Sequence, residues 1–155
     1  MQKIDSFTID HLKLEAGLYV SRVDRYNGMT ATTFDMRITA PNKEEVMPTG
    51  AIHTLEHLGA TFLRNSSIKD RVVYFGPMGC RTGFYLVLFG DAVLQDIIDV
   101  ITEMLMFIIS FEGDIPGATA VECGNYSDQD LNTAKKYAQK YLDALINDKN
   151  FTYPL

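Results

Sequence analysis

The chain contains 155 residues, of which 46% are hydrophobic and 22% charged, and its formal net charge is −6. This length and composition predict a single globular domain, residues 1–155, with one hydrophobic core. The acidic balance argues against a nucleic-acid partner or an anionic membrane surface as a partner.

Four segments have the composition of β-strands, because they are rich in β-branched and aromatic side chains. They are residues 18–25, 31–39, 71–75 and 82–89. Asn27-Gly28 between the first two is a strong hairpin signal, so we expect these strands to pair antiparallel, with a few extra loop residues at the turn.

Three further segments have the 3.6-residue periodicity of amphipathic helices. They run from a Thr49 cap to about Arg64, from Gly90-Asp91 to about Ser110, and from a Ser127 cap to about Asn147. The apolar arc of the second helix is wide enough for a sheet and a second subunit to cover it together. The predicted fold class is α+β, an antiparallel sheet of at least four strands packed against about three to four helices.

The N-terminal residues and the apolar stretch 92–111 indicate in which compartment of the cell the protein is found. The first residues carry a charge every few positions and contain no apolar signal-peptide core. Acidic residues at helical spacing interrupt the stretch 92–111, which indicates an amphipathic helix rather than a membrane span. We therefore expect a cytoplasmic protein without a membrane partner, in a reducing compartment where Cys80 and Cys123 are separate thiols.

Residues 53–57 read His-Thr-Leu-Glu-His and form the most informative stretch of the chain. Successive side chains in a helix turn by about 100°, so His53, Glu56 and His57 would lie on one face. Two imidazoles beside a carboxylate can hold a divalent metal next to a proton-transfer group. Histidine pairs at this spacing also occur by chance, so a third ligand elsewhere has to decide between the two interpretations.

Both cysteines lie in glycine-bearing turns, Gly79-Cys80 and Cys123-Gly124. A buried structural cysteine lies more often inside an apolar strand or helix. Cys123 precedes the last predicted helix, where its thiolate is a suitable third metal ligand. Two imidazoles and one thiolate leave a fourth position for water or substrate, which is the open arrangement of a catalytic site.

Three motifs in this order carry a family resemblance. They are residues 53–57 (His-Thr-Leu-Glu-His), 77–83 (Pro-Met-Gly-Cys-Arg-Thr-Gly) and 122–124 (Glu-Cys-Gly). Supporting matches are Ser6-Phe7, Asp10-His11, Phe34-Asp35-Met36-Arg37 and Pro41-Asn42. The ordered set, which spans nearly the whole chain, resembles the S-ribosylhomocysteine lyase (LuxS) family of autoinducer-2 synthesis enzymes.

The resemblance implies a homodimer with active sites at the subunit interface and one divalent metal per subunit, Fe²⁺ in the native enzyme and replaceable by Zn²⁺ or Co²⁺. It implies cleavage of S-ribosylhomocysteine to homocysteine and 4,5-dihydroxy-2,3-pentanedione, the autoinducer-2 precursor, by metal-assisted carbonyl migration and β-elimination. The implied site residues are metal ligands His53, His57 and Cys123, acid/base residues Cys80 and Glu56, and substrate-pocket residues Ser6, His11 and Arg37.

The chain departs from the family pattern at two positions. Tyr74 and Gly76 stand where the family usually has Asp and Ser. In relatives the Asp helps to bind the amino-acid end of the substrate, so recognition of the homocysteine part is expected to be weakened, altered or relocated. The implied metal ligands and acid/base pair are intact, so the implied reaction type is less affected than the substrate contact.

Two other functions fit part of the pattern. His-x-x-Glu-His is also the inverted motif of zinc peptidases, in which the Glu is the general base. A peptidase would give Cys80 no role. The short chain and the apparent thiolate ligand also argue against this function. A non-catalytic metal-binding module is the second alternative, and it leaves both Glu56 and the open coordination position unexplained.

Overall fold

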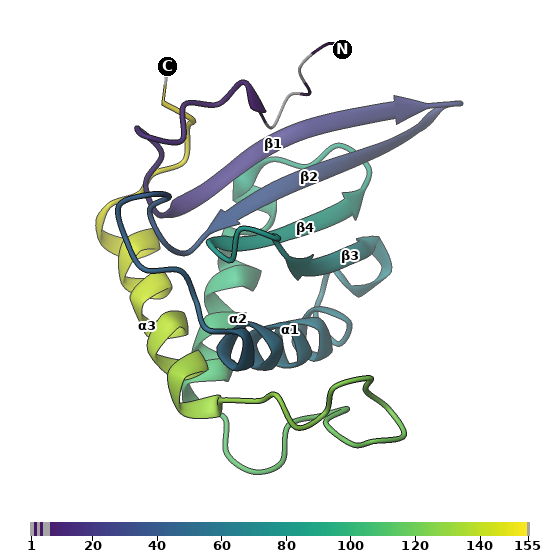
Figure 1. Cartoon of the computed structure of the whole chain (residues 1–155). Helices are drawn as coiled ribbons and strands as arrows, with labels where there is room; N and C mark the ends of the chain where they lie inside the picture. The colour runs from purple at the N-terminus through teal and green to yellow at the C-terminus, as the bar shows by residue number, and fades with distance from the viewer. Residues whose placement is uncertain (1, 3, 5–6, 155) are drawn as a thin grey trace.

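The computed structural model describes residues 2, 4 and 7–154. The described residues form one antiparallel sheet with the strand order β1-β2-β4-β3. Its strands are β1 (Gly17–Tyr26), β2 (Met29–Arg37), β3 (Val72–Pro77) and β4 (Gly83–Phe89). Figure 1 shows that β1 and β2 form a long hairpin that extends beyond the other two strands. The sheet confirms the predicted fold class.

Three α-helices pack against the sheet. They are α1 (Thr49–Leu63), α2 (Ile98–Ser110) and α3 (Leu131–Asn147), with short 3₁₀ turns η2 (Lys69–Arg71) and η3 (Leu94–Asp96). In Figure 1, α1 has the sheet on one side and the long connection between α2 and α3 on the other. No helix among the described residues is long and apolar enough to cross a membrane.

The core lies between the inward face of the sheet and the three helices. Its members include Phe34 and Met36 of β2, Leu86 and Leu88 of β4, Leu55 and Leu58 of α1, Leu105 of α2 and Tyr141 of α3. A Cβ at Gly59 would collide with the ring of Phe75, so glycine at this position lets α1 approach β3 closely. This close packing fixes the helix that carries the His-x-x-Glu-His motif.

The β1–β2 turn is shorter than the hairpin loop predicted from the sequence. β1 ends at Tyr26 and β2 begins at Met29, so Asn27 and Gly28 are the whole loop rather than part of a longer one. Both have positive φ, 47° and 77°, which is the backbone of a type I′ turn. The twist of this turn matches the twist of the strands, so no extra loop residues are needed.

Two of the three predicted helix starts are displaced, and the third lacks its predicted cap. Thr49 is the first residue of α1, and Pro48 holds the cap position without a side-chain hydrogen bond. The second helix begins at Ile98 rather than near residue 91. Thr32 Oγ1 donates to the Gly90 carbonyl and accepts from the Ala92 amide, so residues 90–92 are tied to β2 instead.

Asp130, and not Ser127, caps α3. Its side chain accepts a hydrogen bond of 3.0 Å from the Thr133 amide. We expect Asp130→Ala to lower the free energy of unfolding by about 1 kcal/mol, the usual cost of losing such a cap. Urea denaturation near neutral pH measures this difference.

The same cap predicts a pH dependence. Hydrogen bonds from Thr133 are the largest cause that lowers the pKa of Asp130. A lowered pKa means that the stabilisation is present above the pKa of the unfolded chain and is lost as pH falls through the folded-state pKa. The difference in free energy of unfolding between the wild type and Asp130→Ala should therefore decrease at acid pH. A difference that does not change with pH would contradict a cap that depends on the charged carboxylate.

Candidate metal centre and active site

His53 and His57 lie one turn apart on α1, with ring centroids 4.6 Å apart. Each ring is anchored by a backbone carbonyl of the connection between α2 and α3. His53 Nδ1 donates to the Asp128 carbonyl at 2.9 Å, and His57 Nδ1 donates to the Pro116 carbonyl at 2.7 Å. A carbonyl can only accept, so both rings carry their proton on Nδ1 and leave the Nε2 lone pair available for a metal.

Cys123 completes a group of three potential metal ligands. Its Sγ lies 3.3 Å from His53 Nε2, and the ligand atoms of His53, His57 and Cys123 all lie within 4.8 Å of one another. The turn that carries the thiol is held by the hydrogen bond from the Cys123 amide to the Thr119 carbonyl, at 2.9 Å. Two imidazoles and a thiolate suit Fe²⁺, Co²⁺ or Zn²⁺ and leave an open position.

Gly117 and Thr54 support the backbone segments whose carbonyls orient the two histidines. Gly117, at φ 72°, follows Pro116, and a Cβ there would lie 3.2 Å from His57 Nδ1. Thr54, which is fully buried, donates to Gln129 Oε1 at 2.7 Å and accepts from the Asp130 amide at 3.0 Å. These supporting groups were not identified from the sequence, because a backbone carbonyl leaves no mark in it and Thr54 reads as an ordinary helix residue.

Glu56 lies on α1 between the two histidines in sequence and is half-buried. Its carboxylate is not a member of the three-ligand group. On a helix, position 56 is offset from position 57 by about 100° and from position 53 by about 60°, so the carboxylate borders the ligand face. The role of Glu56 beside the metal group stays a prediction.

Cys80, His11 and Arg37 are brought together elsewhere. They line one cavity of about 390 Å³, to which Phe7 and Tyr85 also contribute. His11 Nδ1 donates to the Ile9 carbonyl at 2.9 Å, which fixes the ring beside the cavity. Ser6, the remaining predicted pocket residue, lies outside the described residues. Cys80, His11 and Arg37, three of the predicted acid/base and substrate-pocket residues, therefore line the same cavity.

Arg37 is buried, although its residue type alone would predict a surface position. Its Nε and Nη2 donate to the two oxygens of Asp35 at 3.1 and 2.6 Å. Burial alone would disfavour the guanidinium charge, but the Asp35 carboxylate outweighs it and raises the pKa of Arg37 above its usual value. Arg37 is therefore a permanent cation in the wall of the cavity.

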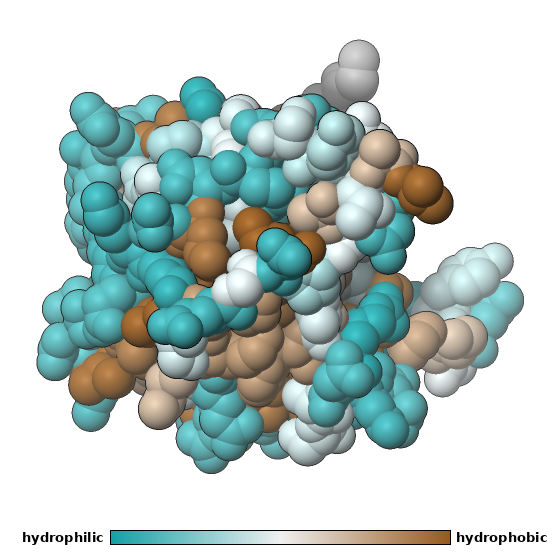
Figure 2. Space-filling view, turned by 90° about the horizontal axis from the view of Figure 1, so that it is seen from below, coloured by the Kyte–Doolittle hydropathy of each residue, from teal (hydrophilic) through white to brown (hydrophobic). Residues whose placement is uncertain are grey.

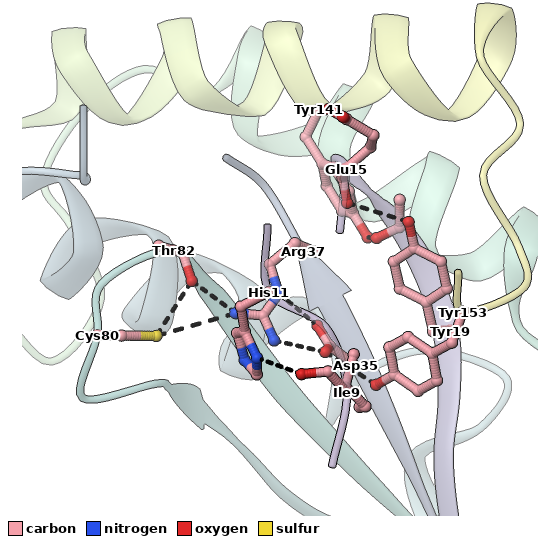
Figure 3. A network of polar contacts seen from close by, with 11 residues as sticks. Ile9, His11, Glu15, Tyr19, Asp35, Arg37, Cys80, Thr82, Tyr141 and Tyr153 are labelled. Carbon is pink, nitrogen blue, oxygen red and sulfur yellow. Dashed lines mark hydrogen bonds and ion pairs between the residues drawn. The ribbon is translucent and has the colours of Figure 1, made fainter. Parts of the chain in front are cut away.

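The cation reaches the Cys80 thiol directly and through Thr82 (Figure 3). Arg37 Nη1 lies 3.9 Å from Cys80 Sγ and donates to Thr82 Oγ1 at 2.6 Å. Thr82 Oγ1 in turn lies 3.1 Å from Cys80 Sγ. Because Thr82 accepts from Arg37, its hydroxyl hydrogen is free to point at the sulfur. The Cys80 sulfur thus has a buried cation and a hydroxyl donor beside it.

The metal group and the Cys80 cavity are separate within one chain. None of His53, Glu56, His57 or Cys123 is among the described residues that line the Cys80 cavity. A larger concavity, of about 550 Å³, lies beside α3 and contains none of the predicted site residues either. Its Lys140 and Glu44 are paired with each other at 2.7 Å.

Tyr74 and Gly76, the two departures from the family pattern, are physically linked. Both belong to the edge strand β3, and Tyr74 is half exposed. A Cβ at position 76 would collide with the Tyr74 hydroxyl, so the present position of this ring requires a glycine two residues later. The two residues therefore depend on each other structurally.

The fold and the site together define an α+β protein with a candidate mononuclear metal centre of two histidines and one cysteine. A family model described as S-Ribosylhomocysteinase (LuxS) matches residues 4–152. The chain is 57% identical to the S-ribosylhomocysteine lyase of Finegoldia magna and 54% identical to that of Clostridium beijerinckii, over 99% of both chains in each case. It is 52% identical to the S-ribosylhomocysteine lyase of Borrelia garinii subsp. bavariensis, over 99% of this chain and 100% of the relative. The chain belongs to the S-ribosylhomocysteinase (LuxS) family, which confirms the resemblance.

Proposed function

We propose that the protein is an S-ribosylhomocysteine lyase that releases homocysteine and 4,5-dihydroxy-2,3-pentanedione, the autoinducer-2 precursor, in the cytoplasm. The observation that carries the proposal is the identity of 50–57% with proteins named for this activity, over nearly the full chain. The two products together contain the same atoms as the substrate. The reaction therefore consumes neither water nor an oxidant. Peptide hydrolysis, the alternative, consumes one water for each bond cleaved.

The thioether sulfur is a poor leaving group until a carbonyl lies β to its carbon. The carbonyl has to migrate along the ribose from C1 to C3, which requires protons to move between neighbouring carbons and oxygens. We propose that the Cys80 thiolate, favoured by Arg37 and Thr82, removes protons from the sugar carbons. We assign Glu56 to the transfer of protons at the sugar oxygens and to protonation of the departing homocysteine sulfur.

His53, His57 and Cys123 would hold the divalent metal, for which we propose Fe²⁺, with Zn²⁺ or Co²⁺ as replacements. The donor set fits it, because both Nδ1 atoms are occupied by carbonyls and both Nε2 atoms remain available. When bound, the metal supplies Lewis-acid stabilisation of the charge that develops on the sugar oxygens. His11, in the wall of the Cys80 cavity, and Ser6 are assigned to substrate binding.

We further propose a homodimer whose active sites combine the Cys80 cavity of one copy with the metal group of the other. The separation of the two groups within one chain supports this arrangement. Large apolar side chains are exposed on the connection that carries Cys123, including Val121, and on the sheet, including Phe89. Figure 2 views the molecule from the side of α1 and this connection, and apolar surface lies there among hydrophilic groups. A second copy would cover such surface.

The test is turnover of S-ribosylhomocysteine by protein purified without oxygen and loaded with Fe²⁺ or Co²⁺. We expect free thiol and trapped dicarbonyl to appear in equal amounts. The O-methyl riboside of the same substrate is the control, because its C1 cannot become a carbonyl and it should release no thiol. Absence of thiol release from metal-replete wild type would refute the proposed function.

A further inference from the structure

The C-terminal segment after α3 returns to the sheet and brings a tyrosine to the buried Asp35. The segment is anchored by Asn150, whose carbonyl accepts from the Leu18 amide at 3.0 Å and whose side-chain amide donates to the Ala16 carbonyl. Three residues further on, the Tyr153 hydroxyl donates to Asp35 Oδ2 at 2.9 Å. Figure 3 shows Tyr153 on the opposite side of the Asp35–Arg37 pair from Cys80.

Tyr153 therefore stands at one end of a continuous series of polar interactions, and Cys80 stands at the other. Tyr153 donates to Asp35, Asp35 accepts two hydrogen bonds from Arg37, and Arg37 donates to Thr82 and approaches Cys80. Asp35, Arg37 and Thr82 are all buried. Bulk water cannot take the place of a hydrogen-bond partner at these buried positions, so a change at one end of the series affects the other end.

We propose that Tyr153 is a positioning residue for Cys80, acting through Asp35 and Arg37 to aim the guanidinium at the thiol. The proposal rests on the proposed role of Cys80 as the base. Arg37 does not lose its proton, so only its orientation controls how strongly it favours the thiolate. That orientation is set by the plane of the Asp35 carboxylate. The hydrogen bond from Tyr153, the third that this carboxylate accepts, helps to hold the plane.

The phenol of Tyr153 is suited to this role. Burial and the neighbouring Asp35 carboxylate raise its pKa far above the usual value, so the hydroxyl stays a donor at every pH at which the protein works. Its ring stacks on Tyr19 at a centroid distance of 4.7 Å and an interplanar angle of 11°, which restricts the direction of the hydroxyl. The residue is therefore both neutral and held in place.

Tyr153→Phe removes the hydroxyl and keeps the ring. The readout is the rate at which iodoacetamide modifies Cys80 as a function of pH, in metal-loaded protein without substrate, followed by peptide mapping that separates Cys80 from Cys123. Among the described residues, the other titratable groups near Cys80 are His11 and Tyr85 in the wall of the same cavity and Arg81, its neighbour in sequence. The substitution leaves all three in place. We expect the profile to move to higher pH, with modification at neutral pH slowed roughly threefold to tenfold.

Tyr19→Phe is the matched control. Like Tyr153→Phe, this substitution removes a phenol hydroxyl and keeps the stacked ring. The hydroxyl of Tyr19, however, donates to the Glu15 carbonyl at 3.0 Å, so its loss leaves the hydrogen bonds of Asp35 intact. We expect both variants to lose similar thermal stability and only Tyr153→Phe to change the alkylation profile. An unchanged profile in Tyr153→Phe, or an equal shift in Tyr19→Phe, would overturn the proposal. Alkylation needs no turnover, so this result is independent of whether S-ribosylhomocysteine is the substrate.

Discussion

Cys80→Ala is expected to reduce thiol release from S-ribosylhomocysteine by about 10²–10⁴-fold in kcat, the usual contribution of a positioned acid/base group. The substitution removes a thiol that both Arg37 and Thr82 approach, and alanine cannot take up a proton. The variant should bind its metal normally, because the three-ligand group does not include this thiol. Steady-state thiol release beside metal analysis measures both effects. Turnover that survives with full metal content would remove Cys80 from the mechanism.

The Cys80→Ala variant also tests the shared active site. Mixed with a His57→Ala variant and allowed to exchange subunits, it should form heterodimers in which one of the two sites has both an intact Cys80 and an intact metal group. With random assortment we expect recovery of roughly a quarter of the wild-type activity. Each variant exchanged with itself is the control and should recover none. If the mixture recovers none either, both groups act within one chain.

Cys123→Ala is expected to lower the affinity for Fe²⁺ or Co²⁺ by more than about 100-fold, the upper end of the loss seen when only a supporting hydrogen bond to a ligand is removed. The thiolate is one of three donors within 4.8 Å, and two imidazoles alone are a weak site. Competition with a chelator gives the affinity. The Co²⁺ form should also lose the absorption band that depends on a sulfur ligand.

His11→Ala is the matched control for this metal prediction. His11 is the remaining histidine of the chain, and it lies in the Cys80 cavity rather than in the three-ligand group. Its loss should leave the metal affinity unchanged while weakening turnover. If Cys123→Ala kept full metal affinity, the ligand set would have to be reassigned.

Local signals in the sequence were sufficient for the elements whose geometry depends on neighbouring residues. Asn27-Gly28 predicted the hairpin because both residues tolerate the positive φ that a type I′ turn needs, and both adopt it. The spacing of His53 and His57 predicted one helix face, and the two rings lie there in edge contact. Cys123 was assigned as a ligand through the family resemblance, because it lies 66 positions after His57 and no periodicity connects the two.

Features that depend on contacts distant in sequence could not be predicted in this way. The second helix does not start near residue 91, because Thr32, on β2, holds residues 90–92; the turn η3 follows, and the helix begins at Ile98. Asp130 rather than Ser127 caps α3, since residue 130 is the one whose amide is held by Thr54 and the Gly50 carbonyl of α1. In each case a partner far along the chain overrides the local preference.

By itself, then, the sequence determined the strands, the helices, the three metal-ligand candidates and the family, because each is written in residue types at short spacing or in an ordered set of motifs. Only the tertiary structure decided that Arg37 is buried against Asp35, that Tyr153 returns to that pair, and that the Cys80 cavity and the metal group are separate. These features arise where the packed sheet and helices bring distant segments together. Burial then strengthens each interaction between their charges and hydrogen-bonding groups.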